Sequence, residues 1–217
     1  MRRGIGSLMP IGILGGTFDP VHFGHLRAAL EVLQDMELDE VRVIPSHTPP
    51  HRAAPVASPD QRLRMVQAAV EGVTGLRVDR RELDRGGISY TVDTLLSLHA
   101  ETGVPPLCLI LGTDAFCGLG SWHRWRELPS LCHFVVVQRP GWEPPRDGAA
   151  ADLLRAGETR DPAQLKRAGG GQVLRHTVTQ LDVSASRIRT AIQAGKSPRF
   201  LLPDAVWRLI QTEGLYR

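Results

Sequence analysis

Cysteine is scarce in this chain, and its few cysteines form no recognisable pair. Cys108, Cys117 and Cys132 are the only three among 217 residues, and no two of them have the CxxC spacing. An odd number of cysteines without that spacing supports neither a disulfide framework nor a structural zinc site. We therefore predict a protein of a reducing compartment, the cytoplasm.

Long apolar runs and a strong excess of one charge are also lacking. Glycine and proline interrupt the apolar residues behind the N-terminal arginines, so neither a secretory signal nor a membrane segment is indicated. Lysine and arginine number 26, against 23 aspartates and glutamates. This balance permits an anionic small ligand such as a nucleotide but does not indicate a nucleic-acid-binding surface. We predict no nucleic acid and no membrane as partner, and the sequence leaves homo-oligomerisation open.

The chain does contain enough apolar residues for one sizeable core. Hydrophobic residues make up 42% of the sequence, and nothing in the composition is typical of a disordered or fibrous protein. We predict a single domain over residues 1–217, in which residues 1–10 form a short lead-in to the first strand. Residues 139–171 are rich in proline and glycine, and we predict an irregular excursion there with one or two short helices.

Short apolar segments typical of strands alternate with helix-length periodic segments. Strands are predicted at residues 11–14, 41–45, 76–80, 107–112, 133–138 and 172–178. Helices are predicted at residues 25–36, 59–71, 91–101, 113–118 and 122–128, with two final helices at 185–194 and 203–213. Several strands are apolar at consecutive positions, as in a sheet buried on both faces. The alternation predicts an α/β fold, a doubly wound parallel sheet with helices on both faces.

The stretch GGTFDPVHFGH (15–25), which follows the first strand, combines bare backbone with two imidazoles. Gly15 and Gly16 allow the main chain to approach an anion at the carboxyl end of a strand. His22 and His25 lie three residues apart at a helix start, where both can donate hydrogen bonds to oxygens that gain charge in a transition state. The spacing matches neither the dinucleotide GxGxxG motif nor the Walker P-loop. We predict a phosphate-binding loop in which histidines replace the P-loop lysine.

Two other interpretations of histidine apply in this chain. The HxxH spacing lacks the i, i+4 geometry and the third ligand of a metalloprotease helix, so a metal site is the weaker alternative for the pair. A histidine outside such a motif is more often structural. This is our interpretation of His47, His99, His133 and His176.

Seven motifs along the chain carry a resemblance to known enzymes. The first, GGTFDPVHFGH, resembles the signature of the nucleotidyltransferases with a T/H-x-G-H motif, which share a Rossmann-like fold. The others are IPSHTPPHR (44–52), SYTVDTL (89–95), LILGTDAF (109–116), WHRWREL (122–128), VVVQRPG (135–141) and VSASRIR (183–189). In this order they resemble the nicotinate-nucleotide adenylyltransferases, which join nicotinate mononucleotide to the AMP part of ATP. The resemblance covers most of the chain but is uninformative over the lead-in and residues 142–170.

The resemblance implies roles for individual residues. It makes His22 and His25 catalytic, with His25 closest to the reacting phosphate. The residues implied to bind ATP are Gly15, Gly16, Thr17, Phe18, Gly112, Asp114, Arg139, Ser184, Ser186 and Arg189. Those implied to bind the mononucleotide are Arg52, Thr91, Trp122 and His123. No side chain is implied as a metal ligand, because Mg²⁺ is expected to be held mainly by the ATP phosphates and water.

The chain departs from the family pattern at three of these places. Arg52 stands where a lysine is common, which keeps the charge but changes its geometry. Ala185 stands where a serine is usual, so one hydroxyl contact to phosphate is missing. Position 123 more commonly holds tyrosine, so the resemblance implies a role for the His123 backbone amide rather than for its side chain.

Three alternative functions stay open at this point. A pantetheine-phosphate adenylyltransferase shares the first motif and the chemistry, but it does not account for SYTVDTL and WHRWREL. A fragment of a class I aminoacyl-tRNA synthetase would need a lysine-rich second signature, and neither Lys166 nor Lys196 lies in one. A nucleotide-sensing or RNA-binding module could keep the fold without turnover, but a pure binder has no use for groups aimed at a transition state.

Overall fold

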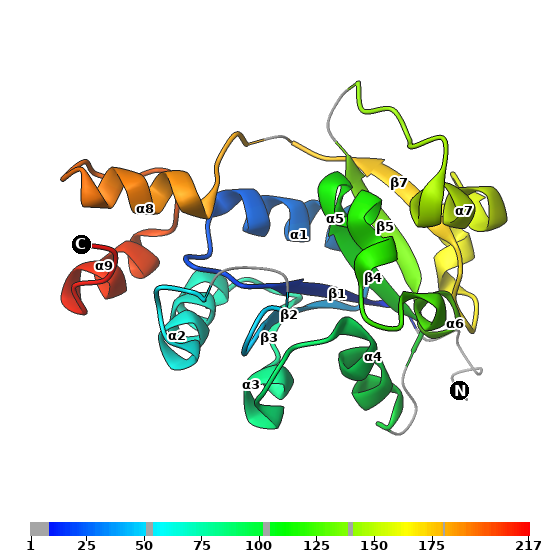
Figure 1. Cartoon of the computed structure of the whole chain (residues 1–217), viewed down its shortest axis with the longest axis horizontal. Helices are drawn as coiled ribbons and strands as arrows, with labels where there is room; N and C mark the ends of the chain where they lie inside the picture. The colour runs from blue at the N-terminus through cyan, green and yellow to red at the C-terminus, as the bar shows by residue number, and fades with distance from the viewer. Residues whose placement is uncertain (1–8, 51–53, 102–104, 139–140, 180) are drawn as a thin grey trace, which may run out of the picture.

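Among the described residues, seven strands form one sheet through the middle of the molecule (Figure 1). The computed structural model describes residues 9–50, 54–101, 105–138, 141–179 and 181–217. The strands are β1 (Ile11–Gly16), β2 (Glu40–Pro45), β3 (Leu76–Val78), β4 (Leu107–Gly112), β5 (His133–Gln138), β6 (Glu158–Thr159) and β7 (Val173–Thr177). Their order is β3-β2-β1-β4-β5-β7-β6, and every neighbouring pair is parallel. The predicted parallel sheet is confirmed.

Helices connect the strands and close the chain. They are α1 (Phe23–Asp35), α2 (Pro59–Val70), α3 (Arg81–Arg85), α4 (Thr91–His99), α5 (Thr113–Cys117), α6 (Leu128–Leu131), α7 (Gly148–Gly157), α8 (Ala185–Gln193) and α9 (Asp204–Thr212). Turns of 3-10 helix lie at Gly118–Ser121, Trp125–Glu127 and Pro162–Lys166. Figure 1 shows α8 and α9 together at one end of the molecule, where α9 packs on α2. Each helix in the described ranges is too short or too polar to span a lipid bilayer.

The core lies on both faces of the sheet, and β4 shows why its sequence is apolar throughout. Leu107, Leu109 and Leu111 pack into one buried cluster with side chains of α4, α5, α6 and α7. Cys108 and Ile110 pack into the other cluster, with side chains of α1, α2, α8 and α9. Successive strand residues point to opposite faces, so both sets must be apolar when helices cover both faces. The predicted two-sided arrangement is confirmed.

The first strand and the first helix are both longer than predicted. The strand predicted to end at residue 14 continues through Gly15 and Gly16, which pair with Ile44 and Pro45 of β2. The helix predicted from residue 25 begins at Phe23, because His22 adopts the extended conformation of an N-cap. Only residues 17–22 therefore connect β1 to α1, and we call them the phosphate loop.

The helix predicted over residues 122–128 is wrong. Trp122 has an extended backbone, and Arg124 has the left-handed value φ 52°, which a continuous helix does not allow. A 3-10 turn follows at Trp125–Glu127, and α6 begins only at Leu128, with a proline in its first turn. The segment WHRW is thus an irregular loop.

Several elements lie in segments with little hydrophobic periodicity. The excursion at residues 139–171 contains α7, the two-residue strand β6 and a 3-10 turn. β6 pairs with β7 and so adds a seventh strand at the edge of the sheet. The five-residue helix α3 is also absent from the prediction, and it follows directly on β3, which ends two residues before the predicted residue 80. Elements this short are below the length over which hydrophobic period can be read.

Candidate active site

The carboxyl ends of β1 and β4 face open space. The chain winds outward from β1 to β2 and β3, then returns to β4 on the other side of β1, so a crevice is expected between these two strand ends. Apart from its two neighbours in the chain, a Cβ atom added at Gly15 or at Gly112 would meet no described residue within 4 Å. A Cβ at Gly16 would lie 2.8 Å from the Phe18 ring, so a side chain there would require this buried ring to shift. A ligand can therefore approach the backbone at the end of both strands.

His22 and His25 lie side by side at the mouth of α1, which begins behind this crevice. Their rings stack with centroids 3.7 Å apart and an angle of 22° between planes. The His22 backbone N–H donates to His25 Nδ1 at 3.3 Å. Because Nδ1 accepts this bond, the hydrogen of a neutral His25 ring is on Nε2. His25 thus has a hydrogen-bond donor, Nε2–H, on the side of the ring away from the His22 backbone N–H.

The His22 ring is buried and uncharged at neutral pH. Its residue is 6% exposed, and Nδ1 has no hydrogen-bond partner among the described residues. Burial lowers the pKa of His22 to about 4. Gly24 allows this placement, since a Cβ there would lie 3.0 Å from His22 Nδ1. The sequence prediction missed Gly24, although it lies inside the first motif.

The phosphate loop itself holds one residue in a strained conformation. Phe18 has φ 51°, in the left-handed region that bulky residues rarely adopt. Its ring is buried and meets the His25 ring edge to face, with centroids 5.1 Å apart and planes at 85°. Such a conformation persists only where the surroundings fix it. Two buried charged residues, Asp19 and Arg62, provide that support.

Asp19 is bound on both carboxylate oxygens by groups from distant parts of the chain. Oδ1 accepts from the Tyr216 hydroxyl at 2.7 Å and from the Ala57 amide at 3.1 Å, and Oδ2 accepts from the Val56 amide at 2.9 Å. The Asp19 carbonyl accepts from Arg189 Nη1 at 2.7 Å. Burial raises the pKa of Tyr216 above its ordinary value, and the contact with Asp19 raises it further. No local sequence signal indicated that Tyr216, near the C-terminal end, contacts the phosphate loop.

The start of α8 lies against the same loop. Ser184 is the N-cap of α8, and its Oγ accepts from the Arg187 amide at 3.3 Å. Ser184 Oγ and Ser186 Oγ are 3.1 Å apart. The Val183 carbonyl lies 3.6 Å from the Cβ position of Gly24, which places this helix start beside that of α1. The two helix N-termini and the Arg189 guanidinium therefore converge near the histidine pair.

A second group of predicted residues lines a pocket of about 270 Å³. Trp122 is half-buried and the residue after it, His123, is exposed, with the His123 ring 4.3 Å from the Tyr90 ring. Thr91 is the first residue of α4, so its amide N–H has no partner inside the helix. The pocket is lined by Pro49, Pro50, Ser89, Tyr90, Thr91, Asp114, Ala115, Gly118, Ser121, Trp122 and His123.

An arginine joins the two walls of this pocket. Arg124 donates from Nε and Nη2 to the two carboxylate oxygens of Glu127, both at 2.7 Å. Its Nη1 lies 3.5 Å from Asp93 in the first turn of α4. A bidentate pair of this kind fixes the side chain in one geometry. Arg124 thereby ties the WHRW loop to the helix that begins at Thr91.

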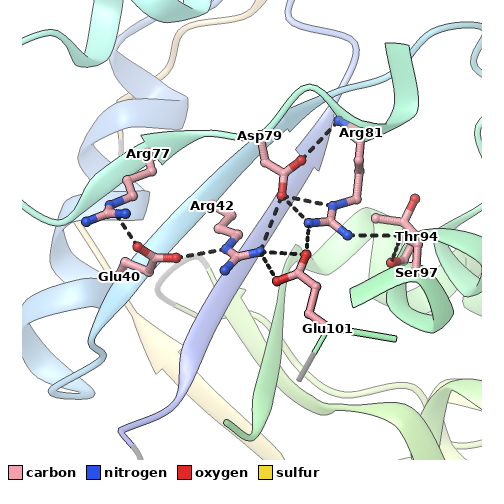
Figure 2. A network of polar contacts seen from close by, with 8 residues as sticks. All are labelled: Glu40, Arg42, Arg77, Asp79, Arg81, Thr94, Ser97 and Glu101. Carbon is pink, nitrogen blue, oxygen red and sulfur yellow. Dashed lines mark hydrogen bonds and ion pairs between the residues drawn. The ribbon is translucent and has the colours of Figure 1, made fainter. Parts of the chain in front are cut away.

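Figure 2 shows the ionic network that ties the other end of α4 to β2 and β3. Arg81 Nη2 lies 2.6 Å from Asp79 Oδ2 and 2.6 Å from Glu101 Oε1, and Arg81 Nη1 donates to Ser97 Oγ at 3.1 Å. Arg42 Nη1 reaches Glu101 Oε2 at 3.2 Å. The two arginines hold the pKa of Glu101 below its ordinary value. A network of several half-buried charges positions a helix better than an isolated surface pair does.

The structure thus gathers most of the predicted site residues at one edge of the sheet. The described residues predicted to bind ATP lie at the ends of β1 and β4, in the phosphate loop, and at the starts of α5 and α8, and the predicted catalytic histidines lie at the start of α1. The pocket begins next to them, at Asp114. Arg52 and Arg139 lie outside the described residues. The other histidines have structural partners: His47 with Thr48 and Gly87, His99 with Leu131, His133 with Arg167 and Gln172, and His176 with Asp35.

Comparison with known proteins gives consistent matches over nearly the whole chain. The family described as cytidylyltransferase-like matches residues 13–191. A probable nicotinate-nucleotide adenylyltransferase of Methylococcus capsulatus is 53% identical over 210 residues, covering 95% of this chain and 99% of the relative. A protein of the same name from Pseudomonas syringae pv. tomato is 53% identical over 208 residues, covering 95% and 93%.

Solved structures show the same fold at low sequence identity. The Plasmodium falciparum nicotinic acid mononucleotide adenylyltransferase complexed with NaAD has a TM-score of 0.70 at 16% identity, covering 96% of this chain and 97% of that one. The same enzyme complexed with APC has a TM-score of 0.69 at 16% identity, with the same coverage. At such identities the likeness is one of fold.

Proposed function

The chain belongs to the nicotinate-nucleotide adenylyltransferases, within the cytidylyltransferase-like family, and we propose which of its residues carry out the reaction. That reaction transfers AMP from ATP to nicotinate mononucleotide, a step of NAD biosynthesis. An oxygen of the mononucleotide 5′-phosphate forms a bond to the α-phosphorus of ATP, and the bond from that phosphorus to the β-phosphate oxygen breaks as pyrophosphate leaves. The 5′-phosphate is already largely ionised at neutral pH, because its second pKa is about 6, so no general base is required. Catalysis then consists of aligning two polyanions and stabilising charge on the transferred group.

The stacked pair of His22 and His25 at the open end of β1 is the observation that carries this assignment. We assign His25 Nε2–H as the donor to the α-phosphate oxygens, because His25 Nδ1 is already occupied by the His22 amide. His22 stays neutral beside it, so two imidazolium charges do not compete within one stack. Donors fixed before the reaction need no reorganisation as charge develops, which makes them effective in the transition state.

The ATP phosphates are assigned to the backbone and side chains around this pair. Gly15, Gly16, Thr17 and Phe18 would supply open main chain at the strand end, and Ser184, Ser186 and Arg189 would hold the phosphates that leave. Gly112 is the last residue of β4 and Asp114 lies in the first turn of α5, where a carboxylate can accept from ribose hydroxyls. Arg139 is assigned to ATP on the resemblance alone.

The mononucleotide is assigned to the neighbouring pocket. The face of Trp122 suits stacking on a pyridine ring, and the amides of Thr91 and His123 suit a carboxylate, which only accepts hydrogen bonds. Arg52 is assigned to this substrate from the motif it belongs to. Because Thr91 begins a helix, the positive end of the helix dipole adds to the attraction for a negative ring substituent.

The reaction is proposed to use Mg²⁺ that arrives on ATP. A hard divalent cation prefers phosphate oxygens and water, and when bound it would neutralise charge on the triphosphate. No group of three His, Cys, Asp or Glu side chains in the described ranges is placed to hold a metal ion. We also propose that the enzyme acts in the cytoplasm, in line with three cysteines that are all free.

A panel of acceptors tests the proposed function. Pyrophosphate release from ATP would be measured with nicotinate mononucleotide, nicotinamide mononucleotide and 4′-phosphopantetheine. The nicotinamide NH₂ would meet the assigned amides donor to donor, at a cost of about 1–3 kcal/mol for each unpaired group. We expect kcat/KM at least about tenfold higher for nicotinate mononucleotide, since about 1.4 kcal/mol corresponds to a factor of ten. Equal values for the two pyridine nucleotides would refute the amide site, and preference for phosphopantetheine would refute the function.

A further inference from the structure

We propose that Arg62 is a positioning residue that couples the ATP site to the mononucleotide site; the proposal rests on the function assigned above. Arg62 lies on α2 and is 0% exposed, so it touches neither substrate. Its guanidinium fills the space between the phosphate loop (17–22) and the residues that follow β2 (46–50), which we call the β2 loop. The first loop belongs to the ATP side and the second contributes Pro49 and Pro50 to the mononucleotide pocket.

Four hydrogen bonds connect this one side chain to backbone carbonyls. Nη1 donates to Thr17 O at 2.9 Å and to Ser46 O at 2.6 Å, and Nη2 donates to His47 O at 2.8 Å. Nε donates to Ala57 O at 3.3 Å. A single nitrogen, Nη1, therefore joins one carbonyl of each loop. If one loop moves away, the geometry of the bond to the other loop must change as well.

The same bonds set the direction of the amides that follow these carbonyls. The C=O and N–H groups of a trans peptide point in opposite directions. With Thr17 O directed at Arg62, the N–H of Phe18 points away from Arg62, where an anion can accept it. With Ser46 O directed at Arg62, the N–H of His47 points the other way and donates to Ser89 Oγ at 2.8 Å in the pocket wall. Arg62 thus fixes a donor on the ATP side and a contact on the mononucleotide side together.

Only arginine has the donors for this task. The guanidinium presents five N–H donors in a rigid plane, whereas a lysine ammonium is a point charge with three. Burial lowers the pKa of Arg62, and the charge of nearby Asp19 opposes that change, but a guanidinium stays protonated at neutral pH. A buried charge without a bonded carboxylate is costly to keep unless its donors are satisfied. Here backbone carbonyls of both the phosphate loop and the β2 loop accept from these donors.

Coupling follows because the phosphate loop contains the strained Phe18. A ligand that accepts from this loop favours the conformation in which Thr17 O meets Arg62. While Arg62 is bonded to Thr17 O, it favours the conformation of the β2 loop in which Ser46 O and His47 O accept from the same guanidinium. By thermodynamic linkage, a ligand that favours this conformation of the β2 loop also favours ligand binding at the phosphate loop. ATP is therefore expected to prepare the mononucleotide site before the second substrate arrives.

The first test uses the wild-type enzyme and hydrogen exchange. α,β-Methylene ATP with Mg²⁺, without mononucleotide, should slow exchange of the amides at residues 17–22 and also those of His47 and Thr48 in the β2 loop. Slowing at 17–22 alone would overturn the coupling but leave the ATP site standing. No slowing at 17–22 would instead remove the proposed ATP site, so the two failures are distinguishable.

The second test measures coupling by titration in a conservative variant. In the wild type we expect α,β-methylene ATP to lower the Kd for nicotinate mononucleotide by about fivefold or more, the usual lower range for coupled sites. Arg62→Lys should reduce this factor to less than about twofold, even where each ligand still binds alone. Arg64→Lys on the same helix is the control, since Arg64 is exposed and pairs with Glu213 at the surface, and it should keep the wild-type factor. An R62K enzyme that is less stable but fully coupled would show that Arg62 merely supports the fold. If R62K does not fold, the exchange experiment decides alone.

Discussion

The phosphate loop and the start of α8 face the same proposed phosphates but are built in opposite ways. In the phosphate loop Asp19 is 5% exposed, and the His22 that ends it is 6% exposed; Asp19 is held by Tyr216, Val56 and Ala57 from far along the chain. At the start of α8, Ser186 is exposed and its hydroxyl bonds to its neighbour Ser184. One region is fixed by the interior, and the other is presented at the surface.

This difference separates two kinds of contribution to catalysis. A donor that is already fixed in place, as His25 is by its ring contacts and its bond to the His22 amide, acts mainly on the transition state, because it needs no reorganisation during the reaction. The partly exposed guanidinium of Arg189 and the exposed hydroxyl of Ser186 bind the ground state and the transition state more equally, and solvent screens them. The comparison therefore assigns the chemical step to the side of His25 and ATP affinity to the side of Arg189.

Removal of the His25 ring should have the largest effect. His25→Ala is expected to lower kcat by about 100-fold or more, while KM for each substrate changes by less than about fivefold, as for the loss of a donor that acts in the transition state. Steady-state kinetics with both substrates varied gives the two constants. His99→Ala is the control, because His99 bonds to Leu131 O away from the site and should leave kcat unchanged. A kcat of H25A within a few-fold of wild type would contradict the assignment.

Burial of His22 should make stability fall in acid. The folded-state pKa of about 4 lies below the ordinary value of 6.5, so the unfolded chain binds more protons between these values. Stability linked to His22 is complete above pH 6.5 and is lost as the pH falls toward 4. Asn can replace His22 at the N-cap without titrating.

Urea unfolding of the wild type and of His22→Asn at several pH values isolates the part of the stability that depends on protonation of His22. The free energy of unfolding of the wild type minus that of the variant should fall by about 2 kcal/mol between pH 7 and pH 4.5. The other titrating groups cancel in this difference. A difference that does not vary with pH would mean that the pKa of His22 is the same in the folded and the unfolded chain, so that burial does not lower it. The two regions would then differ less in burial than the comparison requires.

Loss of Arg189 should act on ATP rather than on turnover. Arg189→Ala is expected to raise the Kd for ATP and for pyrophosphate by about tenfold, with little change for the mononucleotide, because its proposed contact is to the phosphates that leave. Calorimetric titration with each ligand separately gives the three values. Arg187→Ala is a matched control, since Arg187 pairs with Asp182 at the surface. This variant should bind all three ligands with the wild-type Kd. Equal losses for all three ligands in R189A would make Arg189 structural.

The smallest effect is expected from one anchor of the phosphate loop. Tyr216→Phe removes the hydroxyl that donates to Asp19 but keeps the ring, and Asp19 retains the amides of Val56 and Ala57. The free energy of unfolding should fall by about 1 kcal/mol, the usual worth of one hydrogen bond. Because the loop has other anchors, kcat should stay within about threefold of wild type. A large fall in kcat would show that the loop depends on this single bond.

Much of the fold and the local form of the site could be predicted from the sequence. Consecutive apolar residues such as those of β4 require helices on both faces, and both are present. The helix start at His22 and His25 and the N-cap at Ser184 depend on residues next to one another in the chain. Local periodicity and capping chemistry therefore carry this information.

The remainder depends on contacts between distant segments. Nothing near Arg62 or Tyr216 in the sequence indicates that each reaches the phosphate loop, from 45 and 197 residues away respectively. The left-handed backbone of Arg124 is incompatible with the helix predicted at 122–128, and its side chain is held by carboxylates on two different elements. Such tertiary contacts override local propensity, and no pattern within a short window contains them.

Single-turnover kinetics compares the two regions most directly. Limiting nicotinate mononucleotide would be mixed with excess enzyme and saturating ATP, and the dinucleotide formed would be quantified by rapid quench in the wild type, H25A and R189A. The rate of bond formation should fall by about 100-fold or more in H25A, whereas R189A should reach within about threefold of the wild-type rate once ATP saturates. A slow R189A at saturating ATP, or an H25A enzyme that recovers the wild-type rate there, would contradict the division of roles.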